Sequence, residues 1–178
     1  SGLQHFGANN NYLTGSIPAN LPSGLVSFSA FNNQIPGVCD QSKYKCNLLT
    51  GSLPSNLPST LEQIYLGGNQ ISGTISANLP AALKALSLGG NRIGGNLPTS
   101  WPSGLTQIII DANQLTGSVP ANLPTGLTML FLGNNQLTGN IPALPQGLTT
   151  TWCRLDGNKL NVPTPLPSNC TVKPQNPP

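Results

Sequence analysis

The feature that most constrains this chain is a repeat of about 22 residues, a period that is typical of a solenoid in which each repeat forms one turn. A series of asparagines follows this period, with one longer interval between Asn33 and Asn69. The chain also contains 20 Gly and 18 Pro, which would interrupt ordinary helices but which can recur at fixed places in a solenoid turn. The asparagines of the series are Asn11, Asn33, Asn69, Asn91, Asn113, Asn135 and Asn158.

Each repeat has the same internal spacing of apolar residues. In the unit that starts at Leu105, the pattern is L-x-x-L-x-L-x-x-N-x-L, and it recurs at Leu61 and Leu127. Alternation of the second and third apolar residues predicts one short strand per turn, stacked in parallel on its neighbours at about 4.8 Å. We expect the asparagine at the inner corner, where its amide bonds backbone groups that the turn leaves unpaired. The prolines that follow predict an extended or 3-10 returning side, not an α-helix.

Three segments resemble the L-T-G-x-I-P signature of plant-type extracellular leucine-rich-repeat proteins: Leu13–Pro18, Leu49–Pro54 and Leu137–Pro142. That family includes receptor-kinase ectodomains and polygalacturonase-inhibiting proteins, and some relatives bind ice. The resemblance covers residues 3 to about 163 and implies a mainly β, right-handed leucine-rich-repeat superhelix. The unit here is shorter than the usual unit of that family, and the Leu-Pro-x-Gly-Leu link resembles the short-unit bacterial type.

We predict one leucine-rich-repeat domain of seven coils over residues 1–170, followed by a Pro-rich tail at 171–178 that reads as a linker. The long interval between Asn33 and Asn69 admits two interpretations. Either Cys39 to Asn47 forms an extra strand, or one coil carries an insertion at about 35–48. We favour the insertion, because the extra strand would leave a coil that is too short to close.

The four cysteines allow three disulfide pairings. Cys39 and Cys153 would lie about five strands apart, roughly 24 Å at the strand spacing, whereas a disulfide needs Cα atoms within about 7 Å. The solenoid therefore predicts Cys39–Cys46 at the base of the insertion and Cys153–Cys170 in a C-terminal cap over about 153–170. The alternatives are free thiols in a reducing compartment or, with less support from the spacing, a zinc site. Disulfides favour a secreted or cell-surface protein.

Two further expectations concern the ends of the chain. Ser1-Gly2-Leu3 is in phase with the later repeat junctions and no signal peptide precedes it, so we expect the precursor to continue upstream and the first coil to be uncapped. An uncapped strand invites self-association. The sequence Asn169-Cys170-Thr171 is the single glycosylation sequon, with Asn169 as the acceptor.

The strand residues that point outward form columns on what we expect to be the concave face, the usual binding surface of a solenoid. They include an exposed apolar group flanked by charges, and such groups mark interaction sites. We predict a protein or glycan ligand there, with the tip of the insertion contributing from one side. The predicted ligand-binding residues are Tyr65, Gln107, Ile109, Asp111, Met129, Phe131, Trp152, Arg154 and Asp156, together with Lys43, Tyr44 and Lys45.

Composition argues against several other classes. The chain carries 7 basic and 4 acidic residues, a net charge of +3, with no basic cluster for nucleic acid and no apolar run long enough to span a membrane. The lone His5 is about 19 Å from Asp111 at the strand spacing, so no catalytic triad assembles. Asp111 and Asp156 are roughly 10 Å apart by the same count, without a cleft. We therefore expect no enzyme, no cofactor and no metal.

Two other functions remain as alternatives. One is a structural repeat protein that assembles end to end in a coat or filament. The other is an ice-binding protein, since small polar side chains recur once per repeat on a chain with only 6% charged residues. Its first expected column contains Thr14, Thr50, Ser72, Gly94, Thr116 and Thr138, and the next contains Ser16, Ser52, Thr74, Asn96, Ser118 and Asn140.

Overall fold

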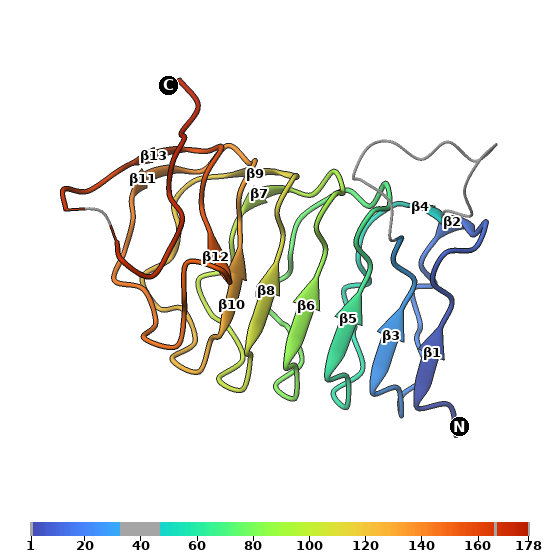
Figure 1. The fold of residues 1–178 in the computed structure, drawn as a ribbon. Helices are drawn as coiled ribbons and strands as arrows, with labels where there is room; N and C mark the ends of the chain where they lie inside the picture. Colours follow the sequence, from blue (N-terminus) through green and yellow to red (C-terminus); the bar gives the residue numbers. More distant parts are fainter. Residues whose placement is uncertain (1, 33–46, 166, 178) are drawn as a thin grey trace.

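The computed structural model describes residues 2–32, 47–165 and 167–177, and it is a stack of turns with the two termini at opposite ends (Figure 1). The main sheet has seven parallel strands in the order β1-β3-β5-β6-β8-β10-β12. Every strand has two or three residues, as expected where only a short stretch of each repeat is extended. The strands are β1 (His5–Gly7), β3 (Ser27–Ser29), β5 (Gln63–Tyr65), β6 (Ala85–Ser87), β8 (Gln107–Ile109), β10 (Met129–Phe131) and β12 (Cys153–Arg154).

The main sheet follows the repeat, because Ile64 lies opposite Leu86, Leu86 opposite Ile108 and Ile108 opposite Leu130. The middle residue of each of these strands points inward and is buried, while its two neighbours are partly exposed at most of the strands. Two residues after the middle residue of each strand, a second row is fully buried: Leu66, Leu88, Ile110 and Leu132. The predicted leucine-rich-repeat solenoid with one short parallel strand per turn is therefore confirmed.

The returning side is extended, as one of the two expectations had it, and the described residues contain no helix of any kind. It forms three two-stranded parallel ladders, labelled along the far edge of the stack in Figure 1. The pairs are β2 (Thr14–Ser16) with β4 (Leu48–Thr50), β7 (Gly94–Asn96) with β9 (Gln114–Thr116), and β11 (Thr138–Asn140) with β13 (Lys159–Asn161).

These ladders step differently from the main sheet. Thr116 lies opposite Asn96 where the repeat predicted Gly94, and Thr50 lies opposite Ser16 where the repeat predicted Thr14. The cause is a glycine in each turn: Gly95 has a φ of 73°, and a Cβ there would lie 2.8 Å from Thr74 Cγ2. At Gly73 and Gly117 as well, a Cβ would lie within 3.0 Å of a side-chain atom of the turn before. The polar columns expected from the repeat period are therefore displaced, and the rows run diagonally.

The asparagine of each repeat joins neighbouring turns from inside. Asn135 is buried, its Oδ1 accepts from the Leu115 N–H at 2.9 Å, and its Nδ2 donates to the carbonyls of Ile110 and Leu132 at 3.0 and 3.1 Å. Since those backbone groups point into the turn away from water, the amide supplies the partners that they need. The same arrangement recurs at Asn69, Asn91, Asn113 and Asn158, which confirms the predicted role for these residues. Asn11, the first residue of the predicted series, is exposed instead, and its Nδ2 donates to the nearby Asn9 carbonyl.

In the second turn, Asn47 occupies the position that the spacing assigned to Asn33. Its Oδ1 accepts from the Leu13 N–H and its Nδ2 donates to the Ala8 and Ala30 carbonyls. The assignment of Asn33 to the series was therefore wrong, because the intervening residues precede the ladder asparagine and do not follow it. Asn33 itself lies outside the described residues.

Asn32 and Asn47 hold the two ends of the intervening segment together. The Asn47 N–H donates to Asn32 Oδ1 at 2.6 Å, and Asn32 Nδ2 donates to the Asn47 carbonyl at 2.7 Å. The regular repeat resumes at Asn47, and β4 begins at Leu48, the residue at which we expected the insertion to end. Residues 33–46 lie outside the described part of the chain, and so do the Cys39–Cys46 pairing and the contributions of Lys43, Tyr44 and Lys45.

The C-terminal end of the stack is covered by the last residues of the chain. Cys153 and Cys170 form a disulfide, and both are buried. The Thr171 N–H donates to the Cys153 carbonyl, the Leu155 N–H to Thr171 and the Gly157 N–H to Pro174, at 2.7 to 2.9 Å. The segment that the prolines suggested was a linker therefore bonds to the last turn, because the edge of that turn has backbone groups that need partners.

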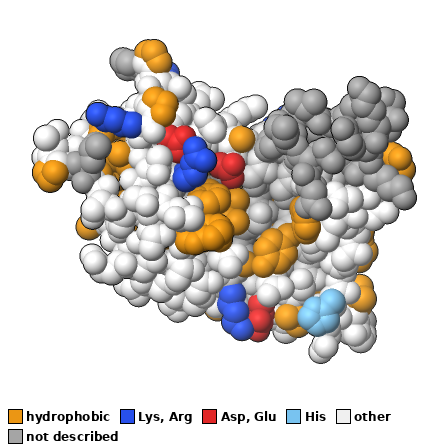
Figure 2. Space-filling view, in the orientation of Figure 1, with side chains coloured by type: hydrophobic (Ala, Val, Ile, Leu, Met, Phe, Trp, Pro, Cys, Tyr) orange, Lys and Arg blue, Asp and Glu red, His pale blue; other side chains and the backbone are white. Residues whose placement is uncertain are grey.

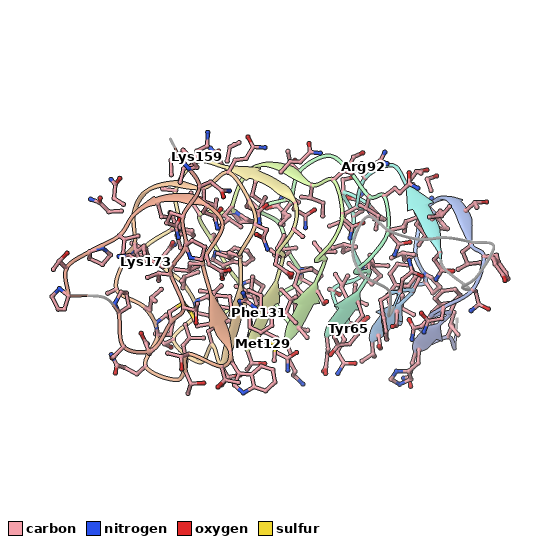
Figure 3. All side chains as sticks on the ribbon, turned by 45° about the horizontal axis from the view of Figure 1, so that its top comes forward. Tyr65, Arg92, Met129, Phe131, Lys159 and Lys173 are labelled. Atoms are coloured by element: carbon pink, nitrogen blue, oxygen red, sulfur yellow. A yellow bond between two sulfur atoms is a disulfide. The ribbon has the colours of Figure 1, made fainter. Side chains whose placement is uncertain are left out.

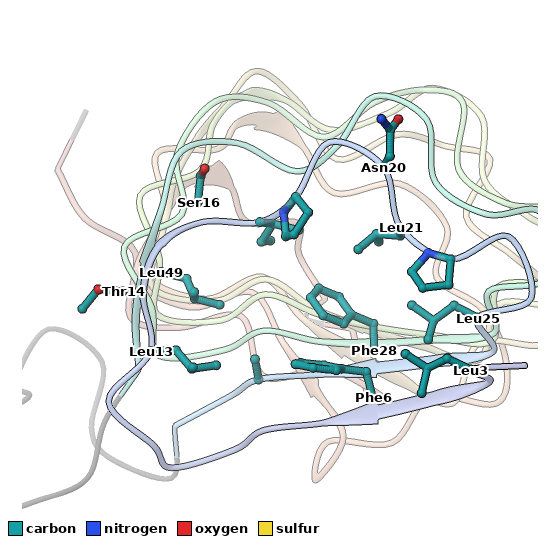
Figure 4. A pocket seen from close by; sticks show the side chains of 14 residues that line it. Leu3, Phe6, Leu13, Thr14, Ser16, Asn20, Leu21, Leu25, Phe28 and Leu49 are labelled. Carbon is teal, nitrogen blue, oxygen red and sulfur yellow. The ribbon is translucent and has the colours of Figure 1, made fainter. Parts of the chain in front are cut away.

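The N-terminal end is open by contrast. Leu3 and Phe6 are 46% and 38% exposed, and the Phe6 ring lies 5.4 Å from that of Phe28. Behind them lies an apolar pocket of about 370 Å³ that reaches into the core of the first turns (Figure 4). In the described residues, nothing pairs with the outer edge of β1.

We expect Asn135→Ala to lower the free energy of unfolding by about 2–3 kcal/mol, because the substitution leaves buried backbone groups without a partner. Urea denaturation measures the change. The control is Asn140→Ala, since Asn140 is exposed and its side chain bonds only to Asn161 among the described residues. Equal losses in the two variants would contradict the structural role of the ladder.

Candidate functional site

The outward side of the main sheet, hereafter the strand face, is built by the residues that flank the buried middle residue of each strand. Because that middle residue is fixed in the core, its neighbours on β8 and β10 must point outward: Gln107, Ile109, Met129 and Phe131. Hydrophobic side chains gather over these strands, with charged side chains directly beside them (Figure 2). Figure 3 shows Tyr65, Met129 and Phe131 on this side of the stack.

An aromatic pair forms the most exposed part of the patch. The rings of Phe131 and Trp152 lie 6.3 Å apart between centroids with an interplanar angle of 15°, so they are stacked. Trp152 is 48% exposed, although it precedes the disulfide cysteine of β12. Its position is set by that disulfide and by the Trp152 carbonyl, which accepts from the Leu130 N–H at 2.8 Å. The structure therefore presents a stacked aromatic surface to solvent.

An ion pair borders the aromatic surface. Arg154 donates from Nε and Nη2 to the two carboxylate oxygens of Asp156, at 3.1 and 2.9 Å. Asp156 is buried while the Arg154 side chain is half-exposed. Both oxygens of this carboxylate are thus engaged by one guanidinium, the geometry in which arginine binds carboxylates most strongly. The hydrogen bond to Asp156 also raises the pKa of Arg154.

Asp111 lies two strands away in the same column. Its carboxylate is seated over Gly89, where a Cβ would come within 2.5 Å of Oδ1, so only glycine leaves room for it. Burial raises the pKa of Asp111 above its ordinary value; its own backbone hydrogen bond and the charge of Arg154 oppose this shift, and the charge of Asp156 adds to it. A small pocket of about 150 Å³ opens here, lined by Asp111, Phe131, Gly133, Asn134, Arg154 and Asp156.

The predicted ligand-binding residues fall into two groups. Ile109 lies opposite Phe131 and Gln107 opposite Met129, and Phe131 lies opposite Arg154, so these side chains share one surface with Asp111. Tyr65 is separated from them by Ser87, which stands between Tyr65 and Ile109 in the sheet. Sequence reasoning did not single out Asn134 or the glycines as part of a pocket. The alternation of Gly89, Asp111, Gly133 and Asp156 in one column was the signal that would have identified it.

The sequon residue Asn169 is half-buried, and its Nδ2 donates to the Pro145 carbonyl at 3.3 Å. Glycosylation at this position stays a prediction. No group of three or more His, Cys, Asp or Glu side chains within residues 2–32, 47–165 and 167–177 is arranged to hold a metal ion. The same residues include no helix of the length and apolar character that a membrane span requires.

Asp111→Asn tests the electrostatics of the pocket. An acid with a raised pKa in the folded state takes up protons on folding, so its contribution to the free energy of unfolding falls as the pH rises from 3.8 through the raised pKa. Because asparagine does not ionise, we expect the variant to gain stability relative to the unsubstituted chain as the pH rises from 3.8 through the raised pKa of Asp111. Urea denaturation at several pH values measures this, with Glu62→Gln as the control for loss of a carboxylate. A difference that stays constant with pH would contradict the assignment.

The chain is similar to known proteins in both sequence and fold. The family model described as Leucine Rich Repeat matches residues 126–148. The structure of the Arabidopsis receptor kinase HAESA, in complex with the peptide hormone IDA and the co-receptor SERK1, is 30% identical with a TM-score of 0.72, over 89% of this chain and 26% of that one. The Arabidopsis BIR2 ectodomain is 27% identical with a TM-score of 0.59, over 68% of each chain.

A plant ice-binding protein shares the fold as well, at 24% identity and a TM-score of 0.68, over 90% of this chain and 50% of that one. No curated protein matches the chain. The chain spans about a quarter of the length of HAESA, 26%. Its repeats and its fold agree with this match, so the chain is a leucine-rich-repeat chain, and its repeats are similar to those of plant receptor ectodomains.

Proposed function

We propose that the chain is an extracellular recognition module that binds a protein or peptide ligand on the strand face. The observation that carries the proposal is the stacked Phe131–Trp152 pair, with Trp152 exposed and Phe131 partly exposed, beside the Arg154–Asp156 ion pair. HAESA is described in complex with a peptide hormone and a co-receptor, which supports a protein ligand for this fold. The module acts by binding and not by turnover.

The energetics of the strand face suit such a ligand. Aromatic and arginine side chains contribute most of the binding energy in protein interfaces, and a rigid aromatic surface loses little entropy when a ligand covers it. The side chains of Phe131 and Met129 flank Leu130, which is fully buried, so their backbone is already ordered before binding. A glycan is the other ligand class that exposed aromatic rings accept, and the peptide-bound receptor favours protein over glycan.

The location outside the cell is part of the proposal. The Cys153–Cys170 disulfide closes the end of the stack, and disulfides persist in oxidising compartments. The receptor ectodomain BIR2 shares the fold over 68% of this chain. Both observations support a secreted or surface-attached protein.

Trp152→Ala is the direct test. We expect peptides selected from a displayed library of random linear peptides to bind the unsubstituted chain and to lose about tenfold or more in affinity for the variant, as for an interface anchor. Tyr12→Ala is the matched control, because Tyr12 is a 57% exposed aromatic residue outside the main sheet. Peptides that bind both variants equally well would show that the strand face is not the binding surface. Unfolding temperatures of both variants establish that each is folded.

Ice binding is the second candidate, favoured by one observation. Small polar side chains on the returning side are exposed and in register between turns, with Ser16 opposite Thr50, Ser52 opposite Ser72 and Asn96 opposite Thr116. Their regular spacing of about 4.8 Å per turn is what an ordered layer of water would need. Threonine, serine and asparagine are also common in turns for local reasons. The regular rows are therefore explained by the fold as well as by ice binding, and we rank ice binding below protein binding.

Recrystallisation inhibition and thermal hysteresis separate the two candidates. If the returning side binds ice, Thr116→Lys and Thr138→Lys should abolish both effects, because a lysine projects out of the exposed row and is strongly hydrated. Ser87→Lys on the strand face should leave them unchanged. A wild-type chain that shows neither effect removes ice binding from consideration.

A structural role by assembly end to end has less support. A filament needs two complementary open ends, since a contact that does not close on itself must repeat. The tail covers the C-terminal end through Thr171 and Pro174, and within the described residues only the β1 end is open.

A further inference from the structure

We infer that the segment bound on the strand face carries a basic side chain, and that Asp111 receives it. The inference rests on the proposed function, because it assigns a chemical class to the ligand of that same surface. It is drawn from the distribution of charge around the pocket between Asp111 and Asp156, and from the position of that pocket beside the aromatic pair.

Asp111 and Asp156 differ in whether their charge is compensated. Arg154 holds Asp156 through both carboxylate oxygens. In the described part of the chain, the Asp111 carboxylate has no ion-pair partner and is hydrogen bonded only to its own backbone. Asp111 is thus a partly buried acid without an ion pair of its own, although the charge of Arg154 acts on it, and a cation from a ligand would supply that pair.

The space beside Asp111 fits a lysine or arginine head group. Gly133 lies between the two acids in the column and lines the bottom of the pocket. Backbone hydrogen bonds hold the three turns together here: the Ala112 N–H donates to the Gly133 carbonyl, and the Asn134 N–H donates to the Asp156 carbonyl. The pocket volume of about 150 Å³ equals that of a few water molecules, each of which takes about 30 Å³ in the liquid. The Phe131 ring forms one wall, where a cation gains a further cation–π attraction.

The distance from the pocket to the apolar surface sets the spacing of the ligand. Phe131 and Gly133 are two residues apart on the same chain segment, which corresponds to about 6–7 Å along an extended backbone. An extended peptide likewise presents residues i and i+2 on one face. A ligand with an apolar residue followed two positions later by a basic residue therefore reaches both the aromatic pair and Asp111.

An acidic ligand group fits this surface less well. Arg154 is the nearest cation, and its Nε and Nη2 already donate to Asp156. A ligand carboxylate could use only the remaining Nη1 and Nη2 hydrogens of Arg154, and its charge would then lie near two acids. The surface therefore selects for positive charge although the whole chain has a net charge of +3.

Three synthetic peptides test the inference, each acetylated and amidated: Gly-Phe-Gly-Lys-Gly, and the same sequence with Gln or Glu in place of Lys. They are titrated into the nitrogen-15-labelled chain, which has only two tryptophans and hence two indole N–H signals. The exposed Trp152 reports on the strand face, and the buried indole of Trp101 is the internal control. We expect the Lys peptide to shift the Trp152 signal and to bind about fivefold more tightly than the Gln peptide, as for a partly desolvated ion pair.

The variants show which acid is responsible. Asp111→Asn should abolish the preference for Lys over Gln while leaving the affinity for the Gln peptide unchanged. Glu62→Gln is the control, because it removes an exposed carboxylate that pairs with Lys84 outside the pocket.

Each other outcome overturns the inference in a distinguishable way. Equal affinity for the three peptides, with Trp152 shifted, would refute the basic ligand and leave the proposed strand-face site intact. Preference for the Glu peptide would assign the site to Arg154 and an acidic ligand. No shift of Trp152 with any of the peptides at millimolar concentration would overturn both the inference and the proposed site for short peptides.

Discussion

The fold depends on hydrogen bonds that the asparagine side chains make between successive turns. Each turn of the solenoid must change direction sharply, and at the inner corner it leaves N–H and C=O groups pointing into the buried, apolar interior. One amide per turn satisfies them by accepting from the previous turn and donating to two carbonyls, as Asn135 does with Leu115, Ile110 and Leu132. The leucine rows fill the remaining interior. Apolar burial drives the stacking, but the amides determine where each turn can bend.

That constraint also shapes the surface where we place the ligand. Because the middle residue of each strand is buried in the core, the adjacent side chains have no freedom to turn inward, and their spacing along the stack is that of the sheet. The strand face is therefore organised before a ligand arrives. Glycines at Gly89 and Gly133 leave room for the carboxylates of the following turn to lie close to the sheet, which is how charged groups come to border an aromatic surface without a cleft.

The repeat sufficed to predict the solenoid, the strands and the Cys153–Cys170 disulfide, since each follows from periodicity and distance along the stack. It also excluded an α-helical returning side, but it left an extended and a 3-10 conformation open. Three features did not follow. Asn33 and Asn47 are the same residue type on either side of one segment, and spacing alone does not decide which one bonds to the turn. The shortened step from Asn96 to Thr116 arises from contacts at glycine that no pattern records. The bonding of Thr171 and Pro174 to the last turn reflects an unpaired edge, which outweighs the tendency of prolines to mark linkers.

The reciprocal bonds between Asn32 and Asn47 have a consequence for how this surface can diversify. They return the backbone to the place that it would occupy if the two residues were consecutive, and from Asn47 to Asn69 the ordinary repeat interval resumes. The alignment of the turns on either side is therefore held by Asn32 and Asn47 themselves. Segments of different length and chemistry can therefore be exchanged at this corner during evolution, or by design, while the turns on either side keep their alignment.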